Sequence, residues 1–131
     1  MLKQVKEIAE GQRFSQYLGF ELVESKADKA IVKLPYAEHL GIDRVNGGAI
    51  SALVDTAATC AFWSHDDAGS ESRGATVGFS INYLHLVVAT DLWATATVRR
   101  RGGSICVGDV SVSNADGKEV AIATVTYKLN P

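Results

Sequence analysis

Specialised features are scarce in this sequence. Only two cysteines and two prolines occur among its 131 residues, and neither sign of charge dominates. Cys60 and Cys106 cannot supply the disulfide framework of a small secreted domain, so we expect a reducing, cytoplasmic setting. Its 13 basic and 15 acidic residues give a net charge of −2, whereas nucleic-acid-binding domains usually carry a basic excess. We therefore expect no nucleic-acid partner.

Long apolar runs are missing as well. No segment offers the roughly 20 apolar residues of a membrane-spanning helix, and Lys3, Lys6 and Glu7 stand where a secretory signal would be apolar. We expect no membrane partner. What is present is a hydrophobic content of 47% and a charged content of 21%, which are typical of globular proteins. The length predicts one domain over residues 1–131 with a real core.

Two stretches have helical character. Residues 1–18 form a loosely amphipathic N-terminal segment, which we expect to be interrupted at Gly11. Residues 47–64 are rich in alanine and apolar nearly all round, so they predict a long, buried helix. The polar residues 66–70 would end it.

Strand-like patterns flank the long helix. The predicted strands are residues 20–24, 30–34, 75–84, 91–100, 105–113 and 119–129. Alternation in 75–84 places Val77, Phe79, Ile81 and Tyr83 on one face and Thr76, Gly78, Ser80 and Asn82 on the other. In residues 105–113 the alternation of apolar and polar residues shifts near Gly108, which predicts a bulge. Asn114 to Gly117 predicts a hairpin turn.

The order of these elements predicts an α+β fold. Short connections between the last four strands favour an antiparallel meander. A single apolar helix must be covered, and a curved antiparallel sheet of about five to six strands wrapped around it is the economical solution.

The start of the long helix is the first candidate site. Gly47 and Gly48 allow another molecule to approach the backbone closely. The first N–H groups of a helix have no partner within the helix and carry partial positive charge. Such donors suit a carbonyl oxygen that becomes negative during nucleophilic attack.

Asp55 is the second candidate, because it interrupts an otherwise apolar helix. It is either a structural carboxylate bonded to a neighbouring hydroxyl or backbone group, or a general base or nucleophile with a raised pKa. Thr59 lies one turn on, on the same face, and is either a group that orients the carboxylate or a water, or a residue that fills the core.

The spacing of the two candidates has a geometric consequence. Gly47 and Asp55 are eight residues apart, which is about 12 Å along a helix. An aspartate side chain cannot span that distance along its own axis. We therefore expect an active site that combines Gly47 of one subunit with Asp55 of another across a two-fold interface.

These residues resemble a known family. The order of elements and the segment from Asn46 to Asp55 are similar to the hotdog-fold acyl-CoA thioesterases, in particular the PaaI-like branch, over residues 15–129. That branch carries His-Gly-Gly and then an acidic residue eight positions after the first glycine, which Gly47, Gly48 and Asp55 match. The resemblance implies that Asp55 is the base or nucleophile and that the Gly47 N–H polarises the carbonyl. Asn46 replaces the motif histidine, either shaping the loop or contacting the carbonyl.

The resemblance extends to further positions. Thr59 matches a small hydroxyl residue of the family, and Thr76 matches a hydroxyl early in the next strand. Asn82 lies in a segment similar to the strand that leads toward the CoA site. The turn after Arg99 to Arg101 resembles a region that meets the CoA phosphates, although a solvated hairpin end is the commoner role of such a run. The substrate-binding residues implied are Gly48, Thr76, Asn82, Arg99, Arg101 and Gly102.

The predicted activity is hydrolysis of acyl-CoA thioesters to free acid and CoA by a homodimer, which also assembles into homotetramers. We expect no metal, because His39, His65 and His85 are widely spaced, and no cofactor beyond the CoA of the substrate. Two departures from the family, Asn46 and Leu40 (an Asn or Gln position in some members), support an alternative, a non-catalytic acyl-CoA-binding hotdog module. A hotdog hydroxyacyl-thioester dehydratase is the other alternative.

Overall fold

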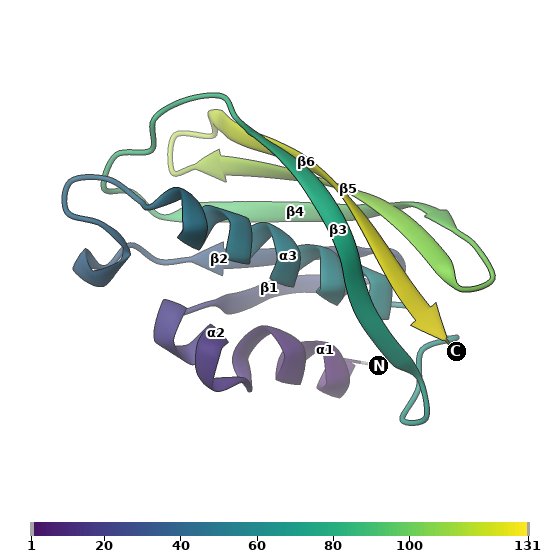
Figure 1. The fold of residues 1–131 in the computed structure, drawn as a ribbon. Coiled ribbons are helices and arrows are strands. Elements are labelled where there is room, and N and C mark those ends of the chain that lie inside the picture. Colours follow the sequence, from purple (N-terminus) through teal and green to yellow (C-terminus); the bar gives the residue numbers. More distant parts are fainter. Residues whose placement is uncertain (1, 131) are drawn as a thin grey trace.

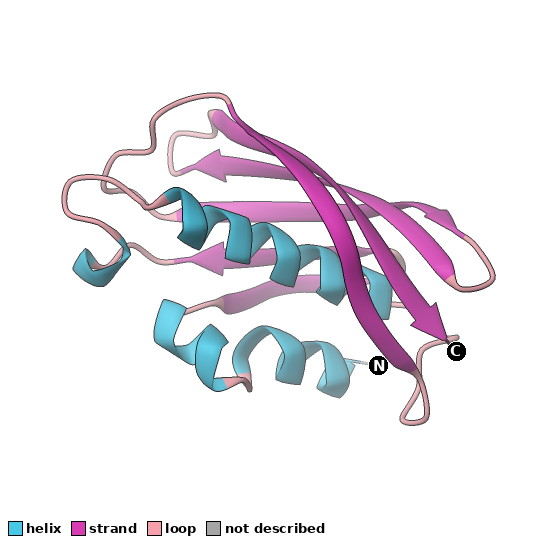
Figure 2. Ribbon diagram, in the orientation of Figure 1, coloured by secondary structure: helices cyan, strands magenta, loops and turns pink. Residues whose placement is uncertain are grey.

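A computed structural model describes residues 2–130 of the protein, and it confirms the α+β architecture (Figure 1; Figure 2). The helices are α1 (Leu2–Glu10), α2 (Arg13–Leu18), the short 3-10 helix η1 (Glu38–Leu40) and α3 (Gly47–Trp63). The strands are β1 (Glu21–Lys26), β2 (Lys29–Leu34), β3 (Arg73–Tyr83), β4 (Leu92–Arg101), β5 (Ile105–Asn114) and β6 (Glu119–Asn130). One antiparallel six-stranded sheet curves around α3, and α1 packs against α3 and β1.

The order of strands differs from the predicted meander. The sheet runs β1-β2-β4-β5-β6-β3, so β4, β5 and β6 form a meander while β3 pairs with β6 at the far edge. The connection between β3 and β4 is long enough to cross the ends of β5 and β6, so it does not force a hairpin. The prediction that β3 and β4 are neighbours was therefore wrong, and this places β3 beside α3 as an edge strand.

The N-terminal segment is interrupted where expected. Helix α1 ends at Glu10, Gly11 follows it, and α2 begins at Arg13. Gly19 closes α2 in the left-handed conformation with φ 88°, and its N–H donates to Ser15 O. Helix α2 turns two aromatic residues outward, since Phe14 is 63% exposed and Tyr17 is 66% exposed.

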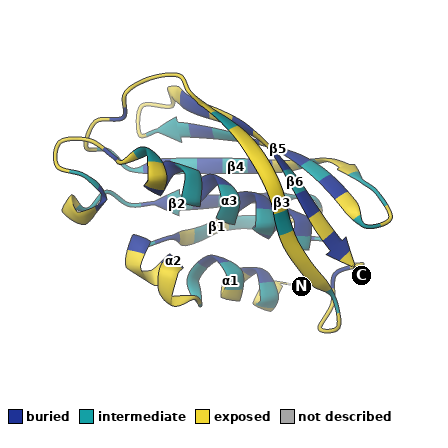
Figure 3. Ribbon diagram, viewed as in Figure 1, coloured by how far each residue is buried: buried dark blue, intermediate teal, exposed yellow. Residues whose placement is uncertain are grey.

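The long helix is buried on most of its circumference but not on all of it. Leu53, Val54 and Ala57 are inaccessible to solvent. A stripe at helical spacing stays half-buried and consists of Ser51, Ala52, Asp55, Thr56, Thr59 and Trp63. The expectation of complete enclosure was therefore wrong, because the curved sheet leaves one side of α3 open next to β3 (Figure 3). We call this stripe the open face of α3.

Strand β3 carries a bulge that changes which residues face the helix. Thr76 pairs with Tyr127 and Gly78 with Thr126, so Val77 is the extra residue. Thr76 therefore shares the inward face with Phe79, Ile81 and Tyr83, whereas simple alternation placed it on the opposite face. Most of β3 is exposed (Figure 3).

The irregularity near Gly108 lies in the neighbouring strand. Val98 pairs with Gly108 and Arg100 with Val107, so the bulged residue is Arg99 of β4. In β5 the positions Cys106, Gly108 and Val110 face the core in regular alternation. The apparent phase slip arose because Gly108 has no side chain; a Cβ there would lie 3.1 Å from Phe62 Cζ, so the Phe62 ring fills the space.

Candidate functional site

Asn46 caps the first turn of α3, and one backbone N–H donor of that turn stays free. Asn46 is the N-cap residue, and its Oδ1 accepts a hydrogen bond from the Gly48 N–H at 2.7 Å. The Asn46 carbonyl accepts from the Ala49 N–H at 3.0 Å and from the Ile50 N–H at 3.2 Å. Within residues 2–130 no acceptor is recorded for the Gly47 N–H. This N–H is therefore available to an external acceptor, with the helix dipole behind it.

Tyr83 fixes the position of this helix start, a role that the sequence pattern did not indicate. Its hydroxyl donates to the Gly47 carbonyl at 2.8 Å. A Cβ on residue 47 would lie 3.4 Å from Tyr83 Cζ, which is ordinary van der Waals contact, so the Tyr83 ring leaves room for alanine there. The alternation of β3 placed Tyr83 on the inward face, but only the tertiary structure brings the end of β3 to Gly47.

A hydrogen bond from the sheet orients the Asp55 carboxylate. Thr76 Oγ1 donates to Asp55 Oδ1 at 2.7 Å, and both residues are half-buried. No hydrogen bond to Asp55 Oδ2 is recorded within residues 2–130. The carboxylate thus keeps one oxygen for another partner, and it belongs to the open face of α3.

Thr59 does not contact the carboxylate. Its hydroxyl donates to the backbone carbonyl of Asp55 at 2.8 Å, which is the usual bond of a threonine to the preceding turn. Of the two predicted hydroxyl residues, Thr76 is therefore the one that orients the Asp55 side chain. The bulge at Val77 makes this contact possible, because it turns Thr76 toward the helix.

A layer of aromatic residues supports Thr76 from the core. Tyr127 pairs with Thr76 across the strands, accepts a hydrogen bond from Trp63 Nε1 at 2.9 Å and stacks on Phe62. Burial raises the pKa of Tyr127, which the Trp63 bond partly offsets, so the phenol is neutral near pH 7.

The helix start and the carboxylate are not brought together within one chain. Helix α3 runs without interruption from Gly47 to Trp63, so the eight-residue separation of Gly47 and Asp55 is again about 12 Å along the axis.

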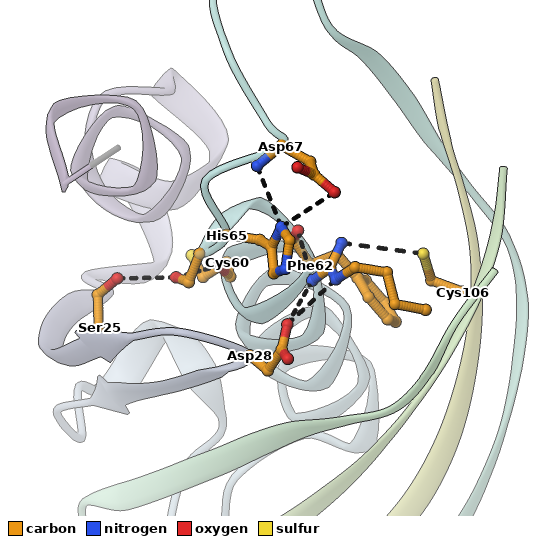
Figure 4. A network of polar contacts seen from close by, with 9 residues as sticks. Ser25, Asp28, Cys60, Phe62, His65, Asp67 and Cys106 are labelled. Carbon is orange, nitrogen blue, oxygen red and sulfur yellow. Dashed lines mark hydrogen bonds and ion pairs between the residues drawn. The ribbon is translucent and has the colours of Figure 1, made fainter. Parts of the chain in front are cut away.

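The predicted arginines lie in different surroundings. Arg101 points inward and is 16% exposed; its Nε and Nη2 donate to Asp28 Oδ1 at 3.1 and 2.8 Å, and Nη2 also donates to the Phe62 carbonyl at 3.1 Å. Figure 4 shows Asp28, Phe62 and Cys106 gathered at this end of α3. Arg101 thus satisfies the last turn of the helix, where a cation is favoured.

Arg99, Asn82 and Gly102 complete the predicted set. Arg99 is exposed, pairs with Asp109 at 3.2 Å and lines a hollow of about 470 Å³ on the outer face of the sheet, which Asn82 also lines. Gly102 forms the turn after β4, where a Cβ would lie 2.6 Å from the Ile105 carbonyl oxygen. The predicted substrate residues therefore occupy four separate places, namely the start of α3, the neighbourhood of Asp55, the outer face of the sheet and the end of β4.

Two further hollows flank the start of α3, and the sequence gave no sign of either. One lies against α2 and η1, and the other lies beneath the residues that follow β3. Within residues 2–130 no cluster of three or more His, Cys, Asp or Glu side chains could hold a metal ion, and no described helix is long and apolar enough to cross a membrane.

The fold has counterparts among known structures. The conserved protein PA5202 from Pseudomonas aeruginosa superposes with a TM-score of 0.85 at 27% identity, covering 95% of this chain and 98% of that one. The E. coli PaaI protein of the phenylacetic acid degradation operon gives a TM-score of 0.85 at 22% identity, with coverage of 97% and 91%. A thioesterase family protein from Silicibacter pomeroyi gives 0.88 at 22%, with coverage of 98% and 97%. The fold is thus the hotdog fold.

The family follows from the sequence itself. The family model of the thioesterase superfamily matches residues 43–121, which include α3, Gly47 and Asp55. The chain belongs to the thioesterase superfamily, whose reaction is thioester hydrolysis, and the prediction of a PaaI-like hotdog protein of this class is confirmed. No curated protein sequence matches the chain.

Proposed function

We propose that the protein hydrolyses acyl-CoA thioesters to a free acid and CoA, with each active site shared between the two subunits of a homodimer. One observation carries the proposal: α3 presents a free Gly47 N–H at its start and, about 12 Å further along, an Asp55 carboxylate held by Thr76 on its open face. Each group suits one half of a hydrolysis reaction, and neither can reach the other within one chain.

The surface around the open face supports a second copy as the missing partner. Strand β3 forms one edge of the sheet and exposes apolar side chains, with Val77 63% exposed. A long apolar strand edge is a template for pairing with another chain. A two-fold axis perpendicular to α3 that passes near Ser51, halfway between Gly47 and Asp55, would place the start of each helix opposite the middle of its partner. Such pairing would bring Asp55 of one subunit to Gly47 of the other.

The proposed chemistry begins with polarisation of the thioester carbonyl by the Gly47 N–H. Water attacks the carbonyl carbon while the Asp55 carboxylate of the partner subunit accepts its proton, and the Gly47 N–H holds the oxyanion. Collapse of the intermediate breaks the C–S bond, and the CoA thiolate leaves. In the other route Asp55 attacks the carbon itself, the thiolate leaves, and water then hydrolyses the mixed anhydride.

The two arginines take different parts in this proposal. Arg99 is accessible and is the one we propose to contact CoA phosphates, in a region of the surface that Asn82 shares. Arg101 is committed to Asp28 and to the Phe62 carbonyl, so its contribution is to hold the turn that carries Gly102.

A panel of short, long and aromatic acyl-CoAs, with a thiol-reporting dye, tests the activity. We expect thiol release by the wild type and a loss of about a thousandfold in Asp55→Ala. Asp116→Ala, which removes an exposed carboxylate from the β5–β6 turn, serves as the control with unchanged rate. Absence of thiol release on the whole panel, or full activity of Asp55→Ala, contradicts the proposal. A single turnover in oxygen-18 water separates the two routes, since only the anhydride route labels the Asp55 carboxylate.

Binding without turnover is the second candidate function, and two contacts favour it. Asn46 Oδ1 is occupied by the Gly48 N–H, and Leu40, which replaces an Asn or Gln of some relatives, is buried in the core. The Asn46 amide is not basic and Leu40 has no polar group, so neither side chain can take a proton from water as a histidine would, and Leu40 cannot bind water as a glutamine would. Calorimetric binding of acyl-CoA by a wild type that releases no thiol would select this function.

A further inference from the structure

We propose that the hollow against α2 binds the acyl group of the substrate, so that Phe14 and Leu18 select its length; this inference rests on the proposed function. The hollow has a volume of about 320 Å³ and lies between α2, η1 and the first turn of α3. We call it the α2 hollow. Its lining includes Phe14, Leu18, Leu40, Gly41, Gly48 and Ala49.

The location of the α2 hollow is the first argument. Gly48 and Ala49 form part of its wall, and they follow Gly47 directly in the first turn of α3. A carbonyl held by the Gly47 N–H therefore lies at the edge of the hollow. The group attached to that carbonyl in an acyl thioester is either the acyl chain or the sulfur of the thiol.

The polarity of the lining decides between these two. His39 Nε2 lies 2.7 Å from the Tyr17 carbonyl oxygen, and Asn46 Oδ1 accepts from the Gly48 N–H at 2.7 Å. One polar atom of each of these two side chains is thus engaged within the protein, and the other side chains of the lining are apolar, so the surface of the hollow is mainly apolar. Such a surface favours an uncharged hydrocarbon group, because a polar group placed there would lose its water contacts.

The hollow on the other side of the helix start is more polar, although Ile50, Leu84 and Leu86 also line it. It has a volume of about 460 Å³, and Gly47, Arg44, Tyr83 and His85 line it. These polar side chains suit the amide-rich arm of CoA better than a hydrocarbon chain. Gly47 and Gly48 are adjacent residues that line different hollows, so a thioester at the Gly47 N–H can extend its acyl group to one side and its thiol arm to the other.

The dimensions of the α2 hollow limit the length of acyl chain that it can cover. Its 320 Å³ is about twice the roughly 150 Å³ that holds a benzene molecule in an engineered cavity. We therefore expect a medium acyl chain of about eight carbons to fill it. The Tyr17 ring packs edge-on against the His39 ring at 4.7 Å, which fixes η1 against α2 and keeps the wall in place. Phe14, 63% exposed, would be covered by the bound chain.

Calorimetry with Asp55→Asn, which would not consume the ligand, tests the subsite directly. Saturated acyl-CoAs from acetyl to dodecanoyl are titrated, with CoA alone as reference. Affinity should rise about fourfold with each buried methylene and level off near eight carbons. Phe14→Ala should weaken octanoyl-CoA about tenfold and leave acetyl-CoA unchanged. Phe14→Trp should move the plateau to shorter chains.

Leu2→Ala is the matched control, because Leu2 is an exposed apolar residue of α1 that does not line the α2 hollow. It should leave every affinity unchanged. Affinity independent of chain length, or an identical chain-length dependence in Phe14→Ala, overturns the subsite. Thiol release by the wild type on the same acyl-CoAs is measured in parallel. Binding that depends on chain length, without thiol release, contradicts hydrolysis and supports the subsite. Thiol release with an affinity that does not change with chain length supports hydrolysis and contradicts the subsite.

Discussion

The two ends of α3 differ in how completely their polar groups are satisfied. At the C-terminal end the Phe62 carbonyl accepts from Arg101, the Cys60 carbonyl accepts from the Ser64 hydroxyl, and the Ser64 carbonyl accepts from the Asp28 N–H. At the N-terminal end Asn46 satisfies the Gly48 N–H, while the Gly47 N–H has no recorded acceptor within residues 2–130.

This difference separates a structural end from a candidate chemical end. A helix terminus whose groups are paired contributes stability and offers little to a ligand. A terminus with a free donor, a glycine and adjoining hollows can receive a carbonyl oxygen. The comparison predicts that removing the free donor at the N-terminal end reduces activity with little loss of stability, and that removing the paired groups at the C-terminal end does the reverse.

Removing the Gly47 donor should give the largest effect. Proline is well tolerated at the first position of a helix, and Asn46 already has the extended conformation that a following proline requires. Gly47→Pro therefore deletes the N–H while the helix persists. We expect kcat to fall by about a hundredfold to a thousandfold, with Tm nearly unchanged. Gly47→Ala keeps the donor and should retain most activity; an active Gly47→Pro enzyme would rule out this N–H as the oxyanion donor.

Mixing two inactive variants tests whether the site crosses the subunits. A heterodimer of Gly47→Pro and Asp55→Asn has one site with both groups intact and one with neither. Random exchange makes half of the dimers mixed, so about a quarter of wild-type activity should return. Two variants that stay inactive after verified subunit exchange would place both groups in sites within single chains.

Arg101→Ala should give the largest loss of stability among these changes. The substitution leaves the Phe62 carbonyl without its donor and Asp28 without its cation, and the Arg101 side chain is only 16% exposed. We expect the free energy of unfolding in urea to fall by about 2 kcal/mol. Arg100→Ala, at an exposed neighbouring position, should change it by less than about 0.5 kcal/mol. Equal losses in the two variants would remove the distinction between the helix ends.

Thr76→Val tests whether Thr76 orients the Asp55 carboxylate, and we expect an intermediate loss of activity. Valine keeps the shape of threonine but loses the bond to Asp55 Oδ1, so kcat should fall about tenfold. Thr59→Val is the matched control on the helix, because the Thr59 hydroxyl bonds only the backbone carbonyl of Asp55. A larger loss of kcat in Thr59→Val than in Thr76→Val would reverse the roles assigned to the two hydroxyls.

Asn46→Ala should have the smallest effect on activity, and it should cost about 1 kcal/mol of stability because Asn46 is the N-cap residue. Asn46→Asp keeps an acceptor for the Gly48 N–H and should restore the stability measured by thermal unfolding. If Asn46 acts only as a cap, both variants should turn over substrate at rates close to that of the wild type. A stable Asn46→Asp enzyme with much lower kcat would assign Asn46 a direct contact with substrate.

The prediction of the fold succeeded where local pattern decides structure. The break at Gly11, the helix from Gly47 and the turn that ends in Gly117 at φ 81° all depend on residues close in sequence. The position of β3 could not be predicted in this way, because pairing with β6 depends on how the sheet curves around α3. The inward orientation of Thr76 was missed for a related reason. A bulge of one residue reverses the alternation of side chains along β3, which is otherwise clear.

The sequence identified the two groups of the candidate site but not their surroundings. Gly47 and Asp55 were found because glycines at a helix start and a carboxylate in an apolar helix are unusual in any sequence. The hydrogen bond from Tyr83 to the Gly47 carbonyl and the ion pair between Arg101 and Asp28 were not predicted. These contacts join residues from distant parts of the chain. An exposed arginine and an inward one look alike in sequence.

The sequence by itself determined the elements, their caps and the two groups about 12 Å apart on one helix, since these follow from backbone propensity and helical periodicity. Only the tertiary structure decided which polar groups of the helix find a hydrogen-bond partner. It pairs Arg101 with the C-terminal end of α3, turns Thr76 onto Asp55 and leaves the Gly47 N–H between two hollows. The physical reason is that burial and hydrogen bonding depend on how a curved sheet closes around a helix, and that closure is a property of the whole chain.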